Sequence, residues 1–165
     1  MHSRIIQLTK EKLNLDEYIE ERDFVGYDDS INNYIQGADY VRSVDDRAGD
    51  IEWFKNYLCD DLELKNYIEL NPKKETLTFK AGFKTAFFQL LFDNFNQLTQ
   101  DLNLEKFSSF SIEIWKLKEI LCPNQGFRIC SEEKADMTSL QDFVRYLSDD
   151  KDETYHVGGV LDYHY

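Results

Sequence analysis

The chain has 165 residues, a length that suits one domain with a single core. Hydrophobic residues make up 42% of it and aromatic residues 15%, with only two prolines and seven glycines, so collagen-like, low-complexity and disordered proteins are excluded. The formal net charge of −13 argues against a protein that binds nucleic acid or an anionic membrane through a basic surface. We therefore expect a single acidic globular domain over residues 1–165.

The first half of the chain combines strands with one capped helix. Residues 3–8 are predicted to form a short strand, and residues 14–40 to form short helical turns and loops. A helix is predicted over about residues 47–58, with Asp45 or Asp46 as its N-cap. Residues 62–65 and 67–70 alternate like strands, and residues 76–80 alternate again after a turn at 71–74, which predicts a hairpin.

The second half is predicted to be mainly helical. A helix over about residues 82–102 has so wide an apolar face that we expect it to be the central helix, buried by a sheet. A second helix is predicted over 108–121, a short strand over 127–130, and a third helix after Thr138 or Ser139 as N-cap. Residues 154–163, interrupted by two glycines, are predicted to form a tight hairpin or a kinked strand.

These elements together predict an α+β fold. We expect a small, mostly antiparallel sheet packed against the long central helix, with two or three further helices. The first residues show no secretion signal, and the longest apolar stretch, around residues 86–92, is far shorter than the ~20 residues of a membrane helix. The three cysteines form no C-x-x-C pair and suit buried thiols in a reducing compartment, so we expect a cytoplasmic protein.

Acidic residues are concentrated early in the chain. Residues 11–63 hold 5 Lys or Arg against 16 Asp or Glu, which is 5 − 16 = −11. Gathered on one face, such carboxylates would steer a basic protein surface toward the domain. We therefore expect a non-enzymatic protein-binding or regulatory module, and its candidate partner-binding residues are Asp16, Glu17, Glu20, Glu21, Asp28, Asp29, Asp45 and Asp46.

Besides a structural subunit of a larger assembly, which would expose an apolar surface patch above the few hundred Å² typical of monomers, two alternatives remain open from the residues alone. The first is a DNA mimic that inhibits a restriction or CRISPR-type nuclease, in which the same carboxylates would form a stripe that substitutes for phosphates. The second is a metal-dependent, nuclease-like enzyme that uses Glu63 and Lys65 on a strand, with Asp46 or Asp50 as a second carboxylate. No known nucleotide-binding or hydrolase motif is present, so we assign no catalytic residue, no cofactor and no metal ligand.

His156 and His164, near the end of the chain, suggest a metal site, but geometry argues against it. If Gly158-Gly159 forms a two-residue turn, the two histidines lie on opposite faces. If residues 154–163 run straight as one strand, His156 and His164 lie eight residues apart, about 26 Å at ~3.3 Å per residue. That separation is too large for one ion.

Overall fold

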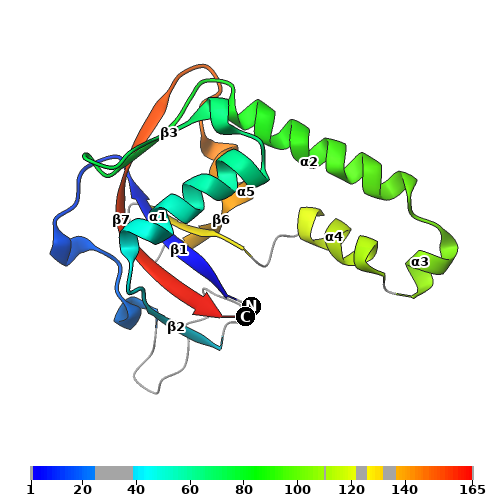
Figure 1. Cartoon of the computed structure of the whole chain (residues 1–165), viewed down its shortest axis with the longest axis horizontal. Helices are drawn as coiled ribbons and strands as arrows, with labels where there is room; N and C mark the ends of the chain where they lie inside the picture. The colour runs from blue at the N-terminus through cyan, green and yellow to red at the C-terminus, as the bar shows by residue number, and fades with distance from the viewer. Residues whose placement is uncertain (1, 25–38, 110, 122–125, 132–136, 165) are drawn as a thin grey trace.

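The computed structural model describes residues 2–24, 39–109, 111–121, 126–131 and 137–164. A seven-stranded mixed sheet carries helices on one face, with a helical arm extending from it (Figure 1). The strands are β1 (His2–Thr9), β2 (Tyr40–Ser43), β3 (Ile68–Asn71), β4 (Thr76–Phe79), β5 (Arg128–Ser131), β6 (Met137–Ser139) and β7 (Glu153–His164). The α-helices are α1 (Arg47–Asn56), α2 (Phe83–Gln100), α3 (Leu104–Ser108), α4 (Ile112–Leu121) and α5 (Leu140–Tyr146). The predicted α+β fold is confirmed.

The long strand β7 organises the sheet. The strand order is β3-β4-β7-β1-β5-β6, in which β1 and β5 are parallel and the other described pairs are antiparallel. One edge of β7 pairs with β1, and the other edge carries β4 against residues 153–156 and then β2 against residues 161–164. The mostly antiparallel sheet therefore agrees with the prediction.

Arg47 fills the gap that β4 and β2 leave along the edge of β7. Its Nη2 donates to the carbonyl of Val157 at 2.6 Å, and its Nε donates to the carbonyl of Gly158 at 2.8 Å. Glu75 pairs with the guanidinium at 2.6 Å, and the ring centre of Tyr18 lies 5.0 Å from it. Because these carbonyls have no strand beside them, the side chain of Arg47 supplies hydrogen bonds that a strand otherwise would.

The pair Gly158-Gly159 forms a bulge within β7. Ile6 pairs with Val160 and Leu8 with Val157, so three steps along β7 oppose two steps along β1. The tight terminal hairpin was therefore a wrong prediction, and the kinked strand is confirmed.

The bulge lies where the segment after β1 crosses the sheet. The buried Gln7 Oε1 accepts hydrogen bonds from the backbone N–H groups of Ile19 (3.0 Å) and Gly159 (2.9 Å). A Cβ atom on Gly159 would come within 2.6 Å of the Ile19 carbonyl oxygen, so this crossing requires glycine.

Each face of the sheet has its own core. The larger core joins β1, β4 and β7 to α1, α5 and the start of α2, and it includes Ile6, Phe54, Phe79, Phe83 and Val144. The smaller core lies on the opposite face and is closed by the segment that holds the 3₁₀ turns η1 (Leu15–Glu17) and η2 (Glu21–Asp23). In this segment Ile19 and Phe24 are buried.

Several boundaries follow the prediction closely. Asp46 accepts from Gly49 N and caps α1, and Ser139 accepts from Asp142 N and caps α5. The strand predicted over 3–8, the turns within 14–24 and the hairpin of β3 with β4 are present. Cys59 and Cys130 are buried, as expected, and Cys122 lies outside the described residues.

Other elements differ from the prediction. Residues 62–65 form no strand, because α1 continues into a π turn η3 (Tyr57–Asp61) and the 3₁₀ turn η4 (Lys65–Tyr67) precedes β3. The helix predicted over 108–121 begins at Ile112, and Phe107 belongs to α3. The helix predicted over 82–102 exists as α2, but only Phe83 and Phe87 in it are buried, so α2 is not the central helix. Its distal part projects from the sheet instead (Figure 1).

Candidate functional site

Strand register brings three charged side chains into one row. Asp162 of β7 is paired with Arg4 of β1 on one side and with Arg42 of β2 on the other. Residues directly opposite in antiparallel strands project on the same face of the sheet. Here that face is the one on which α1 lies, since Asp50 of α1 contacts Arg4.

The row is held together by ion pairs around a buried carboxylate. The side chain of Asp162 is only 5% exposed, and it pairs with Arg4 Nη1, with Arg42 Nε at 3.2 Å and with His2 Nδ1 at 3.0 Å. Arg4 Nε also donates to Asp50 Oδ1 at 2.7 Å, and its guanidinium lies 5.1 Å from the ring centre of Trp53. A buried carboxylate needs such partners, because leaving it unpaired in the interior costs several kcal/mol.

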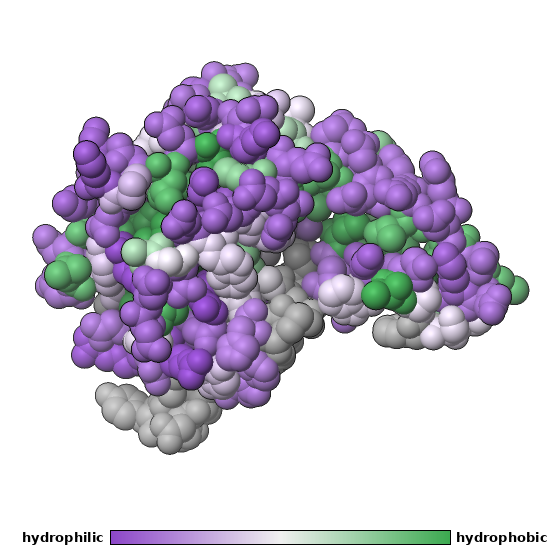
Figure 2. Space-filling view, in the orientation of Figure 1, coloured by the Kyte–Doolittle hydropathy of each residue, from purple (hydrophilic) through white to green (hydrophobic). Residues whose placement is uncertain are grey.

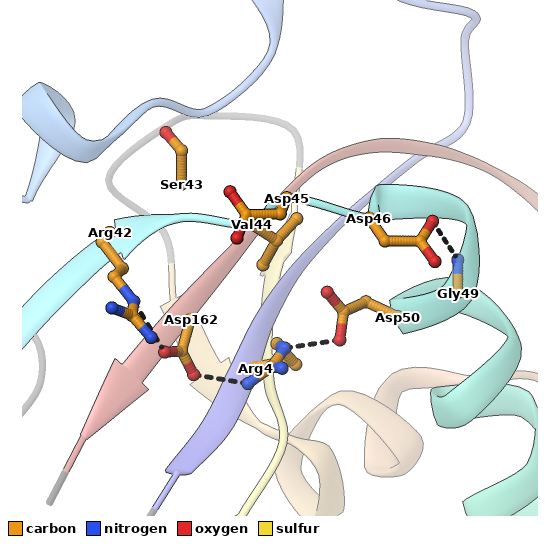
Figure 3. A pocket seen from close by; sticks show the side chains of 9 residues that line it. All are labelled: Arg4, Arg42, Ser43, Val44, Asp45, Asp46, Gly49, Asp50 and Asp162. Atoms are coloured by element: carbon orange, nitrogen blue, oxygen red, sulfur yellow. Dashed lines mark hydrogen bonds and ion pairs between the residues drawn. The ribbon is translucent and has the colours of Figure 1, made fainter.

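A pocket of about 300 Å³ opens beside this row, between β2 and the start of α1 (Figure 3). It is lined by Arg4, Arg42, Ser43, Val44, Asp45, Asp46, Gly49, Asp50 and Asp162. We call it the acidic pocket. Its four aspartates and two arginines give 2 − 4 = −2, so negative charge remains after the internal pairs are formed.

The surplus charge belongs to Asp45 and Asp46 at the rim. Both residues are exposed. Asp46 accepts the Gly49 N–H at 3.0 Å and thereby caps α1, whereas Asp45 has no ion-pair or hydrogen-bond partner among the residues described. The side chain of Arg42, at 61% exposure, is the rim's most accessible cation. Chemically, the pocket can accept a cationic group that contacts the two rim aspartates.

Beyond the charged row lies a row of aromatic and histidine side chains. His2, His164 and Tyr40 are adjacent in the sheet, and the rings of Tyr40 and His164 stack with centres 5.4 Å apart. Asp39 contacts His164 Nδ1 at 2.8 Å. Over the part of the chain that the structure describes, no group of three His, Cys, Asp or Glu residues is arranged to hold a metal ion.

A second pocket, of about 490 Å³, lies near the other end of β1. Its cation, Lys10, pairs with Glu153 and lies 3.6 Å from the ring centre of Tyr155. Burial lowers the pKa of Lys10, but the bonds to Glu153 and Tyr155 outweigh it and raise the pKa. Burial likewise raises the pKa of Glu153, but hydrogen bonds led by that from Lys10 leave it lowered. Lys10 therefore stays protonated, and its charge is balanced within the fold by Glu153.

The predicted partner-binding acids are spread over three elements and one segment outside the described residues. Asp16 and Glu17 lie in η1, Glu20 and Glu21 at η2, and Asp45 and Asp46 at the start of α1, whereas Asp28 and Asp29 lie outside the described residues. The contact of Tyr18 with Arg47 places the end of η1 next to the start of α1, and η2 lies against β2.

Three of these acids also have local partners. Glu17 accepts from Asn14 N at 2.7 Å, Glu20 pairs with Arg22 at 2.7 Å, and Asp46 caps α1. Asp16, Glu21 and Asp45 have none within the described ranges. A stripe of free carboxylates, as a DNA mimic needs, would therefore draw on Asp16, Glu21 and Asp45 before the others.

The residues of the enzyme alternative lie far from the acidic pocket. Glu63 and Lys65 are exposed and lie on no strand: Glu63, with a positive φ of 55°, connects η3 to η4, and Lys65 begins η4. The predicted second carboxylates, Asp46 and Asp50, lie at the opposite end of α1, whose ten residues span about 15 Å at 1.5 Å per residue. The described structure does not bring these groups together.

Sequence reasoning missed Arg4, Arg42, Asp162 and His2. The residues of this row are separated by up to 160 positions in the chain, and no local pattern links them. The signal that could have found Asp162 is a lone acid in an apolar strand, Val160-Leu161-Asp162-Tyr163, since a buried carboxylate requires a cation.

None of the described helices is long and apolar enough to cross a membrane. Comparisons with known proteins found no matching family model, no matching curated protein and no matching solved structure. The chemistry of the acidic pocket is therefore the basis for a functional proposal.

Proposed function

We propose that this protein is a non-enzymatic binding module that takes a basic segment of a partner protein at the acidic pocket. The single observation that carries the proposal is the surplus of negative charge at the rim, where Asp45 and Asp46 are exposed beside a pocket of about 300 Å³. A lysine or arginine side chain is the cationic group that a protein partner can place there.

The internal charges of the pocket prepare it for this role. Arg4 is held by Asp50 and Asp162, so it is not available to attract an anionic ligand. The overall charge of −13 adds long-range attraction for a basic surface and speeds encounter. Both effects favour a cationic partner over an anionic one.

The test is to titrate a short peptide rich in lysine and arginine into the protein and to measure its affinity by calorimetry at low and at high salt. We expect the double variant D45N/D46N to bind about tenfold more weakly, a loss of about 1.4 kcal/mol. Asparagine caps a helix as well as aspartate does, so α1 should be retained. Circular dichroism checks the fold.

The matched control is D60N/D61N, which removes the same charge at the far end of the same helical segment, where both acids are exposed. It should keep the wild-type affinity. R42Q should strengthen binding, because it removes a like charge from the rim. Equal losses in D45N/D46N and D60N/D61N, or no binding by the wild type, would contradict the proposal.

A DNA-mimic inhibitor is the narrower form of this proposal. It is supported by the position of η1 beside the start of α1, where Tyr18, directly after η1, contacts Arg47. It requires that duplex DNA competes with this protein for the basic partner. A partner that binds duplex DNA and this protein at the same time would contradict the DNA-mimic form of the proposal.

A further inference from the structure

The helices α2, α3 and α4 form an arm with little core of its own. We call residues 83–121 the helical arm. Beyond Phe87, the only buried residue among those described in the arm is Leu117 of α4. Two packed helices can bury only the faces that they turn to each other, so their outer apolar side chains stay in water unless another layer covers them.

Large apolar side chains are exposed along this arm. They are Phe92, Leu104, Phe107, Ile112, Trp115 and Leu121, with exposed fractions from 38% to 84%. Figure 2 shows hydrophobic surface recurring along the arm at the right of the view. With the ~150–250 Å² of an aromatic side chain as a guide to the surface of each, these six together expose roughly 550–950 Å².

Most of that range lies above the ~300–600 Å² that the largest apolar patch of a monomer usually exposes. It includes the ~800 Å² per partner of a stable protein interface. Of the exposed apolar residues on α4, Ile112 and Trp115 are three positions apart and lie on one helix face, whereas Leu121 at the end of the helix lies on another.

The charge of the arm indicates what covers it. Residues 83–121 hold 4 Lys against 5 Asp or Glu, which is 4 − 5 = −1, and this leaves −13 − (−1) = −12 for the rest of the chain. A basic partner would therefore be drawn to the rest of the molecule, not to the arm. Conversely, two copies of the chain repel each other everywhere except where their arms meet.

We propose that two copies of this chain associate through their helical arms, each covering the exposed apolar residues of the other. The same surface serves on both copies, as in a two-fold dimer, and the helices of both arms together bury faces that one arm leaves open. The strongly acidic parts then lie away from the contact. This inference does not depend on the proposed function.

The test is the molar mass in solution, by analytical ultracentrifugation over a range of concentrations at low and high salt. The wild type should reach twice the mass of one chain, and more readily at high salt, because screening reduces the repulsion between the acidic parts. The double variant I112S/W115S should remain monomeric. Both residues are exposed in the monomer, so its circular dichroism should match the wild type.

The control L15S/Y146S removes two apolar side chains of even greater exposure outside the arm, and it should dimerise like the wild type. Three results would overturn the proposal: a monomeric wild type at every concentration, a dimer that survives I112S/W115S, or an equal loss in L15S/Y146S. A monomeric wild type would mean that a different protein covers the arm. Loss of peptide binding at the acidic pocket is a separate result that leaves this test unaffected.

Discussion

Gly159 shows how one residue connects the two faces of the molecule. The segment that closes the smaller core crosses the sheet directly over Gly159. The backbone N and O atoms of Ile19 both lie close to the position that a Cβ atom on Gly159 would take. Gln7 fixes this crossing from below, because its carbonyl oxygen accepts from Ile19 and Gly159 together. The bulge in β7 thus positions the segment that carries η1 and η2.

We expect Gly159→Ala to lower the free energy of unfolding by about 2–3 kcal/mol, since an added methyl group meets backbone atoms that cannot rotate away. Urea denaturation followed by circular dichroism measures this difference. Gly158→Ala is the comparison variant, because the three atoms nearest its added Cβ belong to the side chain of Gln7 and include the Oε1 atom that accepts from Ile19 and Gly159. A side chain can move where backbone cannot, so Gly158→Ala should lower the free energy of unfolding by less than Gly159→Ala does, and a larger loss would show that the hydrogen bonds of Gln7 matter more than the close approach of Ile19.

At the scale of elements, α2 depends on a cap from a distant part of the chain. Its N-cap residue is Gly82, which has no side chain to accept a hydrogen bond. Asp149, after α5, accepts instead from the Thr85 hydroxyl and from Thr85 N at 3.1 Å. These two bonds lower the pKa of Asp149, although burial opposes them. The start of the helical arm is thereby joined to the end of α5.

Asp149→Ala should therefore lower the free energy of unfolding by about 1 kcal/mol at pH 7. Because the pKa of Asp149 is lower in the folded than in the unfolded state, its contribution is present above the ordinary carboxyl pKa near 4 and is lost as the pH falls through the folded value. The stabilities of the wild type and Asp149→Ala should therefore converge at low pH, and thermal unfolding of both proteins from pH 7 to pH 2 measures this. The neighbouring Asp150→Ala, which removes an exposed acid, should leave stability nearly unchanged throughout.

Elements with a strong local signal could be predicted from the chain alone. The strand at 3–8 and both helix caps follow from apolar pattern and capping chemistry, and so does the hairpin of β3 and β4. By contrast, β2 and β6 were not predicted, because the segments Tyr40–Ser43 and Met137–Ser139 show no alternating pattern of their own and are recognised by their pairing with β7 and β5. Local reasoning also misjudged α2, whose apolar stripe does not reveal what lies against it.

The candidate site was predictable only in part. Asp45 and Asp46 were found, because a dense acidic segment is visible in the sequence. Their pocket depends on Arg4, Arg42 and Asp162, which meet through strand register between distant parts of the chain. Register is a tertiary property, since a shift of one residue would turn Asp162 to the other face.

At the scale of the whole molecule, stability is unevenly distributed. The strands β1 and β7 lie at the centre of the sheet and between two cores, whereas the distal part of the helical arm has a single described buried residue, Leu117. Regions with few buried apolar contacts open locally at much lower free energy than the global unfolding. The arm should therefore open while the sheet stays closed.

Hydrogen–deuterium exchange measured by mass spectrometry tests this distribution. We expect the amides of β1 and β7 to exchange slowest and those of residues 88–121 much faster in dilute protein, where single chains predominate. Raising the concentration should slow exchange in the arm alone, because a second arm covers it while the sheet gains no new contact. In I112S/W115S the arm should exchange fast at every concentration. Protection of the arm equal to that of β7 in dilute protein would contradict this account, because it would show that the arm already has a core of its own.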